Sequence, residues 1–331
     1  MEDKTFKILA IDGGGIKGLY SSTILEHLEK KYKGNISDYF DMLCGTSTGG
    51  LIALALSLKI PTKEISDIYL KNGNKIFPKK SKISNKYNQI LGKGKFSDEP
   101  LKKVLNEMFK EKTLSDSNNL LCIPSYSITD ARPWVFKFDH IEGDLSRDNK
   151  ARYVDVALAT SAAPTYFPMA EIEYYDYKQF VDGGVWANNP TLVGLIEALT
   201  YYVGKDKKFK KLKILSISSL NSTGGKPTGL KRARGFVDWR DDLFETSLIG
   251  QSLFTDYFMS KIKEIEDVSV EYIRIPSAKI SPQQASLVQL DVATTDALNL
   301  IRGMGNDMGE IYKKKNEISD FFKMQKQYKI N

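Results

Sequence analysis

The chain is poor in the residues on which several classes of protein depend. Among its 331 residues are two cysteines, Cys44 and Cys122, and two histidines, His27 and His140. Each cysteine lies in an apolar, strand-like run, which is typical of buried thiols in a reducing compartment and excludes a disulfide framework. No group of histidine, cysteine and carboxylate residues has the spacing of a metal site, so we expect neither a metal nor a cofactor.

Long apolar runs are also missing. None reaches the roughly 20 residues that a membrane-spanning helix needs, and no signal peptide precedes the first predicted strand. We therefore expect a cytoplasmic protein whose contact with a membrane is peripheral. Lysine and arginine outnumber aspartate and glutamate by 48 to 41, and the net charge of +7 favours anionic partners such as phospholipid or nucleic acid.

Apolar runs of strand length alternate with helical patterns along the chain. The predicted strands are 6–11, 40–44, 120–128, 133–138, 179–181, 212–219 and 269–275, and the predicted helices are 19–32, 51–56, 62–77, 96–110, 153–160, 190–203, 243–265 and 294–325. This order predicts an α/β fold with a mainly parallel sheet covered on both faces. Binding sites in such sheets collect at the carboxyl ends of the strands. No repeat or low-complexity linker divides the chain, so we expect one domain over residues 1–331.

A glycine-rich loop follows the first predicted strand. Asp12–Gly18 reads Asp-Gly-Gly-Gly-Ile-Lys-Gly and leads into a predicted helix. Gly13, Gly15 and Gly18 match the G-x-G-x-x-G dinucleotide fingerprint, but the second strand ends without the acidic residue that would bind the ribose. A Walker loop is excluded because Leu19, and not lysine, follows Gly18. Two interpretations remain, a tight turn and a nest of backbone amides that binds an oxyanion.

The stretch Gly45–Gly49 has the Gly-x-Ser-x-Gly pattern between a predicted strand and a predicted helix. That context is typical of a nucleophile elbow. Gly45 and Gly49 would leave room for backbones to cross, and Ser47 would stand at a helix N-terminus, which favours developing negative charge. A glycine-rich turn with a non-catalytic serine has the same pattern, so both interpretations stay open.

A serine nucleophile needs a base, and the scarcity of histidine limits the choice. His27 lies inside a predicted helix beside apolar residues, and His140 follows a predicted strand. Neither position favours a catalytic base, although His140 remains an alternative. Asp182 ends an apolar run and precedes Gly183 and Gly184, which would let another backbone approach closely. We therefore favour a dyad in which Asp182 accepts the proton, and an ordinary turn at Asp182 is the alternative.

Four separated motifs together resemble the patatin-like phospholipases. They are the loop 12–18, the elbow 45–49, the small-residue turn Ser161–Phe167, and Asp182–Gly184 with Asn188–Pro190, and the resemblance covers residues 5–220. It implies a three-layer α/β/α fold and hydrolysis of membrane phospholipid acyl esters of the phospholipase A type. No general motif of the family matches the extension 221–331.

Carried over by position, the resemblance implies that Ser47 is the nucleophile and Asp182 the base. Gly45, Gly49, Gly183 and Gly184 belong to the elbow and the base loop. Lys17 stands where the family often has arginine, which keeps the charge but loses bidentate hydrogen bonding. The implied oxyanion-hole loop comprises Gly13, Gly14, Gly15, Lys17 and Gly18.

The length and the glycine loop also resemble bacterial patatin-like effectors of anti-phage defence, which cyclic nucleotides activate. That resemblance implies a cyclic oligonucleotide activator and peripheral contact with the inner membrane, and it leaves the oligomeric state open. The basic, acid-free stretches 79–95 and 221–237 are candidate contacts for headgroups, and 226–234 for the nucleotide phosphates. A dinucleotide-binding oxidoreductase and a non-catalytic nucleic-acid-binding protein are the alternative functions.

Overall fold

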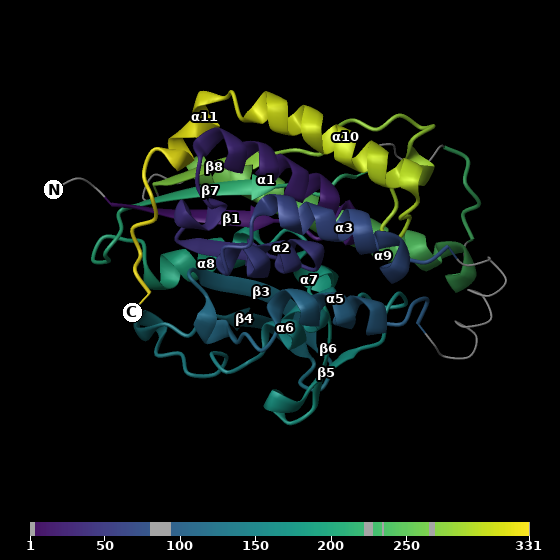
Figure 1. Cartoon of the computed structure of the whole chain (residues 1–331), viewed down its shortest axis with the longest axis horizontal. Helices are drawn as coiled ribbons and strands as arrows, with labels where there is room; N and C mark the ends of the chain where they lie inside the picture. The colour runs from purple at the N-terminus through teal and green to yellow at the C-terminus, as the bar shows by residue number, and fades with distance from the viewer. Residues whose placement is uncertain (1–3, 80–93, 222–227, 234, 265–268, 331) are drawn as a thin grey trace.

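An eight-stranded sheet forms the centre of the structure (Figure 1). The computed structural model describes residues 4–79, 94–221, 228–233, 235–264 and 269–330. Seven strands follow the order β5-β6-β3-β2-β1-β7-β8, and β4 pairs with β3. The strands are β1 Thr5–Ile11, β2 Met42–Gly45, β3 Leu120–Ser127, β4 Arg132–Lys137, β5 Ala170–Ile172, β6 Lys178–Asp182, β7 Lys211–Ile217 and β8 Val270–Ile275.

Helices cover both faces of this sheet. They are α1 Gly18–Tyr32, α2 Thr48–Ser57, α3 Thr62–Ile76, α5 Glu99–Phe109, α6 Tyr153–Ser161, α7 Gly184–Ala187, α8 Thr191–Tyr201, α9 Phe236–Lys261, α10 Thr295–Tyr312 and α11 Asn316–Ser319. Ile123 of β3 faces α2, whereas Cys44 of β2 faces Gly194 of α8. The predicted three-layer α/β/α fold is therefore confirmed.

Chain direction explains which helix lies on which face. From β1 the chain passes through α1 to β2 and then through α2 to β3, always toward the same edge of the sheet. From β7 it passes through α9 to β8, toward the other edge. Right-handed crossovers in opposite directions require opposite faces. The strand order therefore reverses between β1 and β7, and a reversal of this kind opens a crevice at the carboxyl ends.

Two strands pair with the same edge of β3, one with its first part and one with its last part. Leu120–Cys122 pair in parallel with Met42–Cys44 of β2. Ser125–Ser127 continue past the end of β2 and pair with Phe180–Asp182 of β6, which runs antiparallel. The carboxyl ends of β2 and β6 therefore approach each other head-on. This arrangement brings a residue of an antiparallel strand to the carboxyl edge of the parallel ones.

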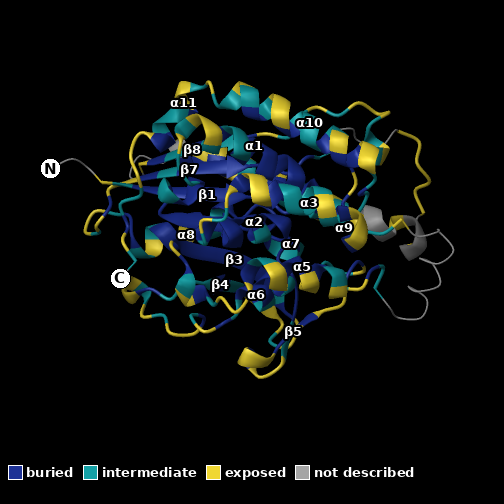
Figure 2. Cartoon of the chain, in the orientation of Figure 1, coloured by how far each residue is buried: buried dark blue, intermediate teal, exposed yellow. Residues whose placement is uncertain are grey.

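The central strands are buried on both faces. Every residue of β2 is buried, as are six of the seven residues of β1. Figure 2 shows this dark core surrounded by helices whose outer faces are exposed. Continuous apolar runs are what a parallel sheet between two helical layers requires. The sequence prediction of a mainly parallel sheet is confirmed, with β4, β5 and β6 as antiparallel additions at one side.

The C-terminal segment returns across the amino ends of the central strands. Asp41, just before β2, accepts hydrogen bonds from the amides of Lys7, Gln327 and Tyr328. The Lys7 ammonium donates to the carbonyls of Phe321 and Met324. Burial lowers the pKa of Lys7 to about 8. Residues 321–328 thus close the end of the sheet opposite the candidate site.

Several predicted boundaries are wrong. The helix predicted over 294–325 ends at Tyr312, because the chain turns back so that Phe322 stacks on Tyr32. The helix predicted over 243–265 spans Phe236–Lys261, so that it begins inside the basic stretch 221–237. The helix predicted from 96 begins at Glu99, with the Ser97 hydroxyl accepting from the Glu99 amide.

The base loop also differs from the prediction, and parts of the basic stretches lie outside the described residues. The short helix α7 was not predicted, and Pro190, not Asn189, directly precedes α8. Asn189 Oδ1 still accepts a hydrogen bond from the Thr191 amide at 3.0 Å. Of the two basic stretches, residues 80–93, 222–227 and 234 lie outside the described part of the chain. No helix in the described part is long and apolar enough to span a membrane.

Candidate active site

Ser47 lies between β2 and α2 with a backbone conformation that is rare for any residue but glycine. Its φ is 53° and its ψ is −125°. Such a conformation costs about 1–3 kcal/mol and persists only where the surroundings enforce it. The Ser47 side chain stands at the N-terminus of α2, where the positive end of the helix dipole favours negative charge. The geometry is that of a nucleophile elbow.

The two glycines of the elbow allow this turn because no side chain fits at either position. A Cβ on Gly45 would lie 2.1 Å from the Gly49 carbonyl oxygen, and a Cβ on Gly49 would lie 2.2 Å from the Ile11 carbonyl oxygen. These neighbours are backbone atoms, which cannot move aside as a flexible side chain could. Gly45 and Gly49 therefore hold β1, β2 and α2 in close contact around Ser47.

The end of α6 holds the nucleophile and the base in register. Thr160 Oγ1 accepts a hydrogen bond from the Ser47 amide and donates one to the Pro124 carbonyl. The Ala162 carbonyl accepts a hydrogen bond from the Asp182 amide at 3.0 Å. Sequence reasoning identified the small-residue turn here but missed this role of Thr160. A hydroxyl just before that turn was the available signal.

Asp182 ends β6 and points at the nucleophile. Its buried carboxylate accepts a hydrogen bond from the Gly184 amide at 2.7 Å and lines the same pocket as Ser47. Burial raises the pKa of Asp182 to about 7, although the Ser47 hydroxyl and the Gly184 amide both act to lower it. A carboxylate with a pKa near neutrality is suited to general base catalysis. Ser47 and Asp182, which were predicted to act together, are 135 positions apart in the sequence and line the same pocket in the structure.

Of the predicted oxyanion loop, only part is available to a ligand. The Gly13 amide donates to the Asn188 carbonyl, and the amides of Lys17 and Gly18 donate to carbonyls within the loop. The amides of Gly14 and Gly15 have no acceptor among the described residues. Of the five residues predicted for the oxyanion loop, Gly14 and Gly15 are therefore the ones whose amides could donate to a ligand.

A further amide lies on the other side of Ser47. The Thr48 amide opens α2 and likewise has no acceptor among the described residues. The residue after the nucleophile supplies an oxyanion donor in other elbow enzymes, and the sequence analysis did not include it. Gly14, Gly15 and Thr48 all line the same pocket as Ser47.

Lys17 does not line the pocket and is tied to another element. Its buried ammonium lies 3.7 Å from Glu245 Oε1 of α9, and burial lowers the pKa of Lys17. The neighbouring Asp12 accepts two hydrogen bonds from the Arg274 guanidinium of β8. Burial raises the pKa of Asp12, and Arg274 opposes that effect. These charges anchor the glycine loop, and they do not contact the pocket.

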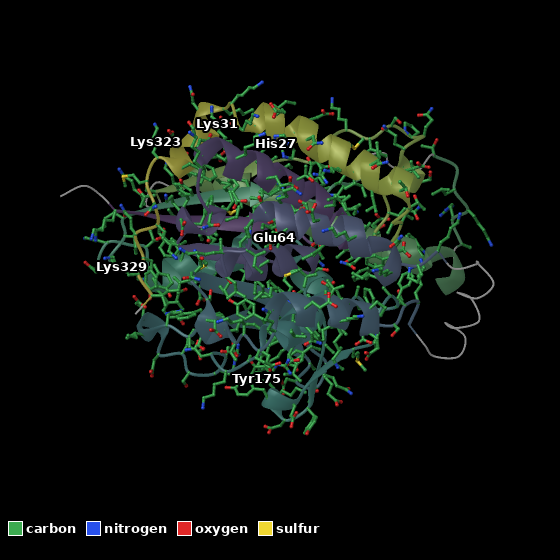
Figure 3. All side chains as sticks on the ribbon, in the orientation of Figure 1. His27, Lys31, Glu64, Tyr175, Lys323 and Lys329 are labelled. Carbon is green, nitrogen blue, oxygen red and sulfur yellow. The ribbon has the colours of Figure 1, made fainter. Side chains whose placement is uncertain are left out.

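Neither histidine lies near the nucleophile. Figure 3 shows His27 on α1, where its ring contacts Asn306 Oδ1 and Glu310 Oε1 of α10. His140 is buried, with Nε2 3.1 Å from Glu197 Oε1 and Nδ1 accepting from the Gly143 amide. Neither ring lines the pocket that contains Ser47. Among the described residues that line this pocket, Asp182 is the carboxylate.

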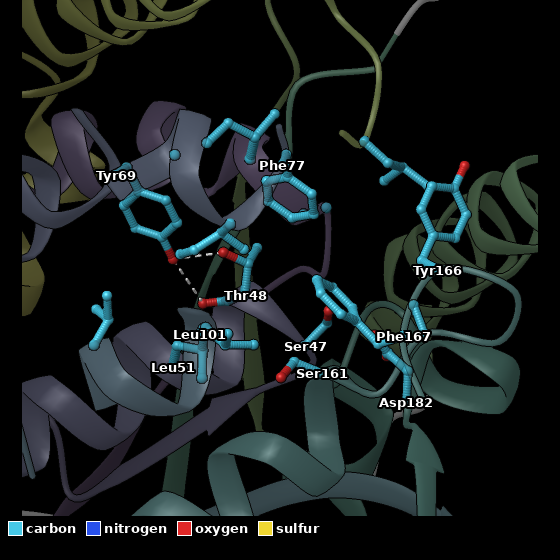
Figure 4. A pocket seen from close by; sticks show the side chains of 18 of the residues that line it. Ser47, Thr48, Leu51, Tyr69, Phe77, Leu101, Ser161, Tyr166, Phe167 and Asp182 are labelled. Atoms are coloured by element: carbon cyan, nitrogen blue, oxygen red, sulfur yellow. Dashed lines mark hydrogen bonds between the residues drawn. The ribbon is translucent and has the colours of Figure 1, made fainter. Parts of the chain in front are cut away.

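The pocket in front of Ser47 is apolar except at its catalytic end. Figure 4 shows Ser47, Ser161 and Asp182 together, with Tyr69 and Phe77 farther along the wall. The empty space in front of Ser47, counted together with the solvent at the mouth of the pocket, is about 950 Å³. The apolar lining comes from α2, α3, α5, α9 and two loops, and comprises Leu51, Ile65, Ile68, Tyr69, Ile76, Phe77, Leu101, Val104, Leu105, Met108, Tyr166, Phe167, Phe244, Leu248 and Leu290.

Comparison with known proteins gives a consistent result. A family model described as "Patatin-like phospholipase" matches residues 9–195. A protein of Pseudomonas aeruginosa named "cGAMP-activated phospholipase" is 32% identical over 305 residues, which cover 91% of this chain and 87% of that protein. A protein of the same name from Vibrio cholerae is 28% identical over 339 residues, with 96% and 94% coverage. Patatin-like protein 2 of Arabidopsis thaliana is 28% identical over 338 residues, with 91% and 82% coverage.

The strained backbone at Ser47 leads to a prediction about stability. Ser47→Gly and Ser47→Ala both remove the hydroxyl, but only glycine relieves the positive φ. The glycine variant should therefore be more stable than the alanine variant by about 1 kcal/mol, as measured by urea unfolding. At Lys103, an exposed position inside α5, the same pair should show the opposite order. A more stable alanine variant at position 47 would contradict the strained elbow.

Proposed function

The chain belongs to the patatin-like phospholipase family, and from that premise we propose that it cleaves phospholipid acyl esters with a Ser47–Asp182 dyad. The observation that carries the proposal is that Ser47, on a strained elbow, and the buried Asp182 carboxylate lie together at the polar end of an apolar pocket, where the Ser47 hydroxyl acts on the pKa of Asp182. The pocket has the chemistry of an acyl chain, and the two polar side chains have the chemistry of acyl transfer.

In the proposed mechanism Asp182 takes the proton of Ser47 as the Ser47 oxygen attacks the ester carbonyl. The pKa of about 7 makes Asp182 a stronger base than an ordinary carboxylate, because burial disfavours its charged form. Asp182 then gives the proton to the departing alcohol. A water molecule that Asp182 deprotonates releases the acyl group from Ser47 and restores the enzyme.

The oxyanion in this mechanism is bound by backbone amides. Gly14, Gly15 and Thr48 each have an amide without an acceptor among the described residues, and all three line the pocket beside Ser47. Donors that are fixed before the reaction stabilise the negative charge without reorganisation. The dipole of α2 acts in the same direction. Lys17 has a positioning role here, since it joins the glycine loop to α9.

The alternative functions have little support in the structure. A dinucleotide-binding oxidoreductase requires an acidic residue at the end of β2, where Thr46 and Ser47 stand instead. A non-catalytic nucleic-acid-binding protein gives no reason for a strained serine beside a buried carboxylate in an apolar pocket. Family membership and the site therefore agree on hydrolysis.

We also propose that a cyclic oligonucleotide activates this enzyme as part of anti-phage defence. Two of the relatives carry the name "cGAMP-activated phospholipase", which supports a nucleotide of that class. In the described part of the predicted phosphate-binding stretch, Lys231 and Arg232 are exposed. They lie five and four residues before α9, whose Phe244 and Leu248 line the pocket. A phosphate bound there would act on the pocket wall through α9.

Peripheral membrane contact in the cytoplasm belongs to the same proposal. The substrate of a phospholipase lies in a bilayer, and the net charge of +7 favours anionic headgroups. A constitutively active phospholipase would attack the cell's own inner membrane, which gives a reason for control by a ligand.

The dyad is tested by removing each partner. Ser47→Ala and Asp182→Asn should each lower ester hydrolysis by a factor of about 10³ or more, because the two residues act as a unit. His27→Gln and His140→Gln, whose rings lie outside the pocket, should retain activity. Turnover of a soluble ester and of phospholipid vesicles measures the effect. An active Asp182→Asn variant, or an inactive but folded His140→Gln variant, would reassign the base.

The pKa of Asp182 predicts a pH dependence. Since the base must be ionised, kcat/KM for an uncharged ester should rise with pH through about 7 and then level off. Because the pKa of Asp182 is raised from 3.8 to about 7 by folding, the proton that stabilises the folded state is lost as pH rises from about 4 to about 7. Wild type should therefore lose stability relative to Asp182→Asn between these two values and not above them. A pH profile that is flat through neutrality would contradict this assignment.

Activation is tested with the purified enzyme and a panel of cyclic di- and trinucleotides. Phospholipid hydrolysis should be slow alone and should accelerate with one member of the panel. Lys231→Ala/Arg232→Ala should lose the acceleration and keep the basal rate, because these residues would contact phosphate and do not line the pocket. Lys30→Ala/Lys31→Ala removes the same charge from the exposed end of α1 and should respond as wild type does. Full activity without ligand, unchanged by every nucleotide, would disprove the control.

A further inference from the structure

Helix α9 has an outer face that is unusually apolar for an exposed surface. Leu253, Phe254 and Tyr257 are 64%, 63% and 63% exposed, and Leu243 and Phe258 are also exposed. With about 100° of rotation per residue, these side chains and Gly250 fall within an arc of about 140°. Contiguous apolar surface of this kind marks an interaction site.

The inner face of α9 has both apolar and polar side chains, and these contact the rest of the chain. Phe244 and Leu248 line the pocket. Ser252 accepts a hydrogen bond from the Asn188 amide group, and Gln251 accepts one from the Asn188 backbone. Asp256 accepts a hydrogen bond from Tyr272 of β8. The apolar outer face is therefore not needed to dock α9 onto its own chain.

The central part of the outer face lacks charge. Between positions 243 and 258, all described and exposed residues are uncharged: Leu243, Thr246, Ser247, Gly250, Leu253, Phe254, Tyr257 and Phe258. Lys261, at the end of α9, is exposed on the same side of the helix. A surface that meets its own copy across a twofold axis meets its own charges, and like charges at an interface are costly. The uncharged centre of the face avoids this penalty, and in an antiparallel pair Lys261 lies outside the part that crosses at Gly250.

Gly250 is the natural centre of such a contact. A Cβ at Gly250 would have no neighbour within 4 Å, so its backbone is open to a partner. Leu243 and Tyr257 lie seven residues before and after it, two turns in each direction. In an antiparallel pair of α9 helices that cross at Gly250, Leu243 of one copy would pack near Tyr257 of the other. Glycine at the crossing lets two helices approach closely.

We propose that this protein forms a twofold dimer through the outer face of α9. Five exposed side chains, each contributing roughly 100 Å², would bury about 1,000 Å² over both copies, which is the area of a weak interface whose formation depends on protein concentration. The partner is a second copy of the same chain, and the proposal does not depend on the reaction. Its consequence is that the wall carrying Phe244 and Leu248 is supported from outside by the other protomer.

The first test measures mass in solution by sedimentation. Wild type should be a dimer, and Phe254→Glu/Tyr257→Glu should be a monomer with an unchanged circular dichroism spectrum, because four carboxylates would meet across the axis. Ile311→Glu places a charge on an exposed apolar position of α10 and should remain a dimer. A monomeric wild type at every soluble concentration, or a double variant that stays dimeric, would overturn the proposal.

The second test locates the contact by cross-linking. Gly250→Cys should form a disulfide-linked dimer under mild oxidation, because the two copies of position 250 lie at the crossing. Gly303→Cys, at an equally open position on α10, should not cross-link. The native cysteines Cys44 and Cys122 are buried and do not interfere. Equal cross-linking of the two variants would refute the α9 interface. Weaker binding of the double glutamate variant to anionic vesicles, with a monomeric wild type, would assign the face to a membrane instead.

Discussion

The candidate site depends on the pairing of two strands, β2 and β6, with the same edge of β3. Parallel β2 pairs with the first part of that edge and antiparallel β6 with the last part. Because both strands end where they approach each other, Ser47 just after β2 and Asp182 at the end of β6 lie in the same pocket. A wholly parallel arrangement would have placed the start of a strand at this position. The proximity of the two residues of the proposed dyad is therefore a consequence of the antiparallel addition to the sheet.

Burial at this junction determines the chemistry and has a cost in stability. The Asp182 carboxylate is removed from water, which raises its pKa to about 7 and makes it an effective base. The backbone at Ser47 is strained, and Gly45 and Gly49 fit only because they lack side chains. Such features are retained where the surrounding structure enforces them. Here the fully buried strands of the central sheet provide that rigidity.

Helix α9 connects the catalytic loops with the surface. On its inner side, Glu245 pairs with Lys17 of the glycine loop, and Ser252 binds the side chain of Asn188 beside the base loop. The basic residues Lys231 and Arg232 lie just before the helix. A ligand or a second protomer that contacts α9 would therefore act on the pocket wall and on the loop that carries the free amides. The family motifs end before this helix, so its role is visible only in the structure.

The sequence by itself determined the elements and the chemistry of the site. Alternating apolar runs and helical patterns predicted the α/β sheet, and the elbow around Ser47 followed from local glycine spacing. The scarcity of histidine and the apolar run that ends before Gly183 and Gly184 favoured Asp182 as the base, and the resemblance to a known family implied the same role. These features are readable because they depend on residues close together in the chain or on motifs already associated with a family.

Only the tertiary structure decided which amides of the glycine loop are free and what surrounds the base. The Gly13 amide donates a hydrogen bond to the Asn188 carbonyl, which lies 175 positions later in the sequence. Thr160 binds the Ser47 amide across 113 positions, and Lys17 pairs with Glu245 of a helix outside the family motifs. No local pattern encodes such contacts, because they arise when the crossovers fold distant segments onto one edge of the sheet. The long-range packing of the chain therefore determined how the predicted residues work together.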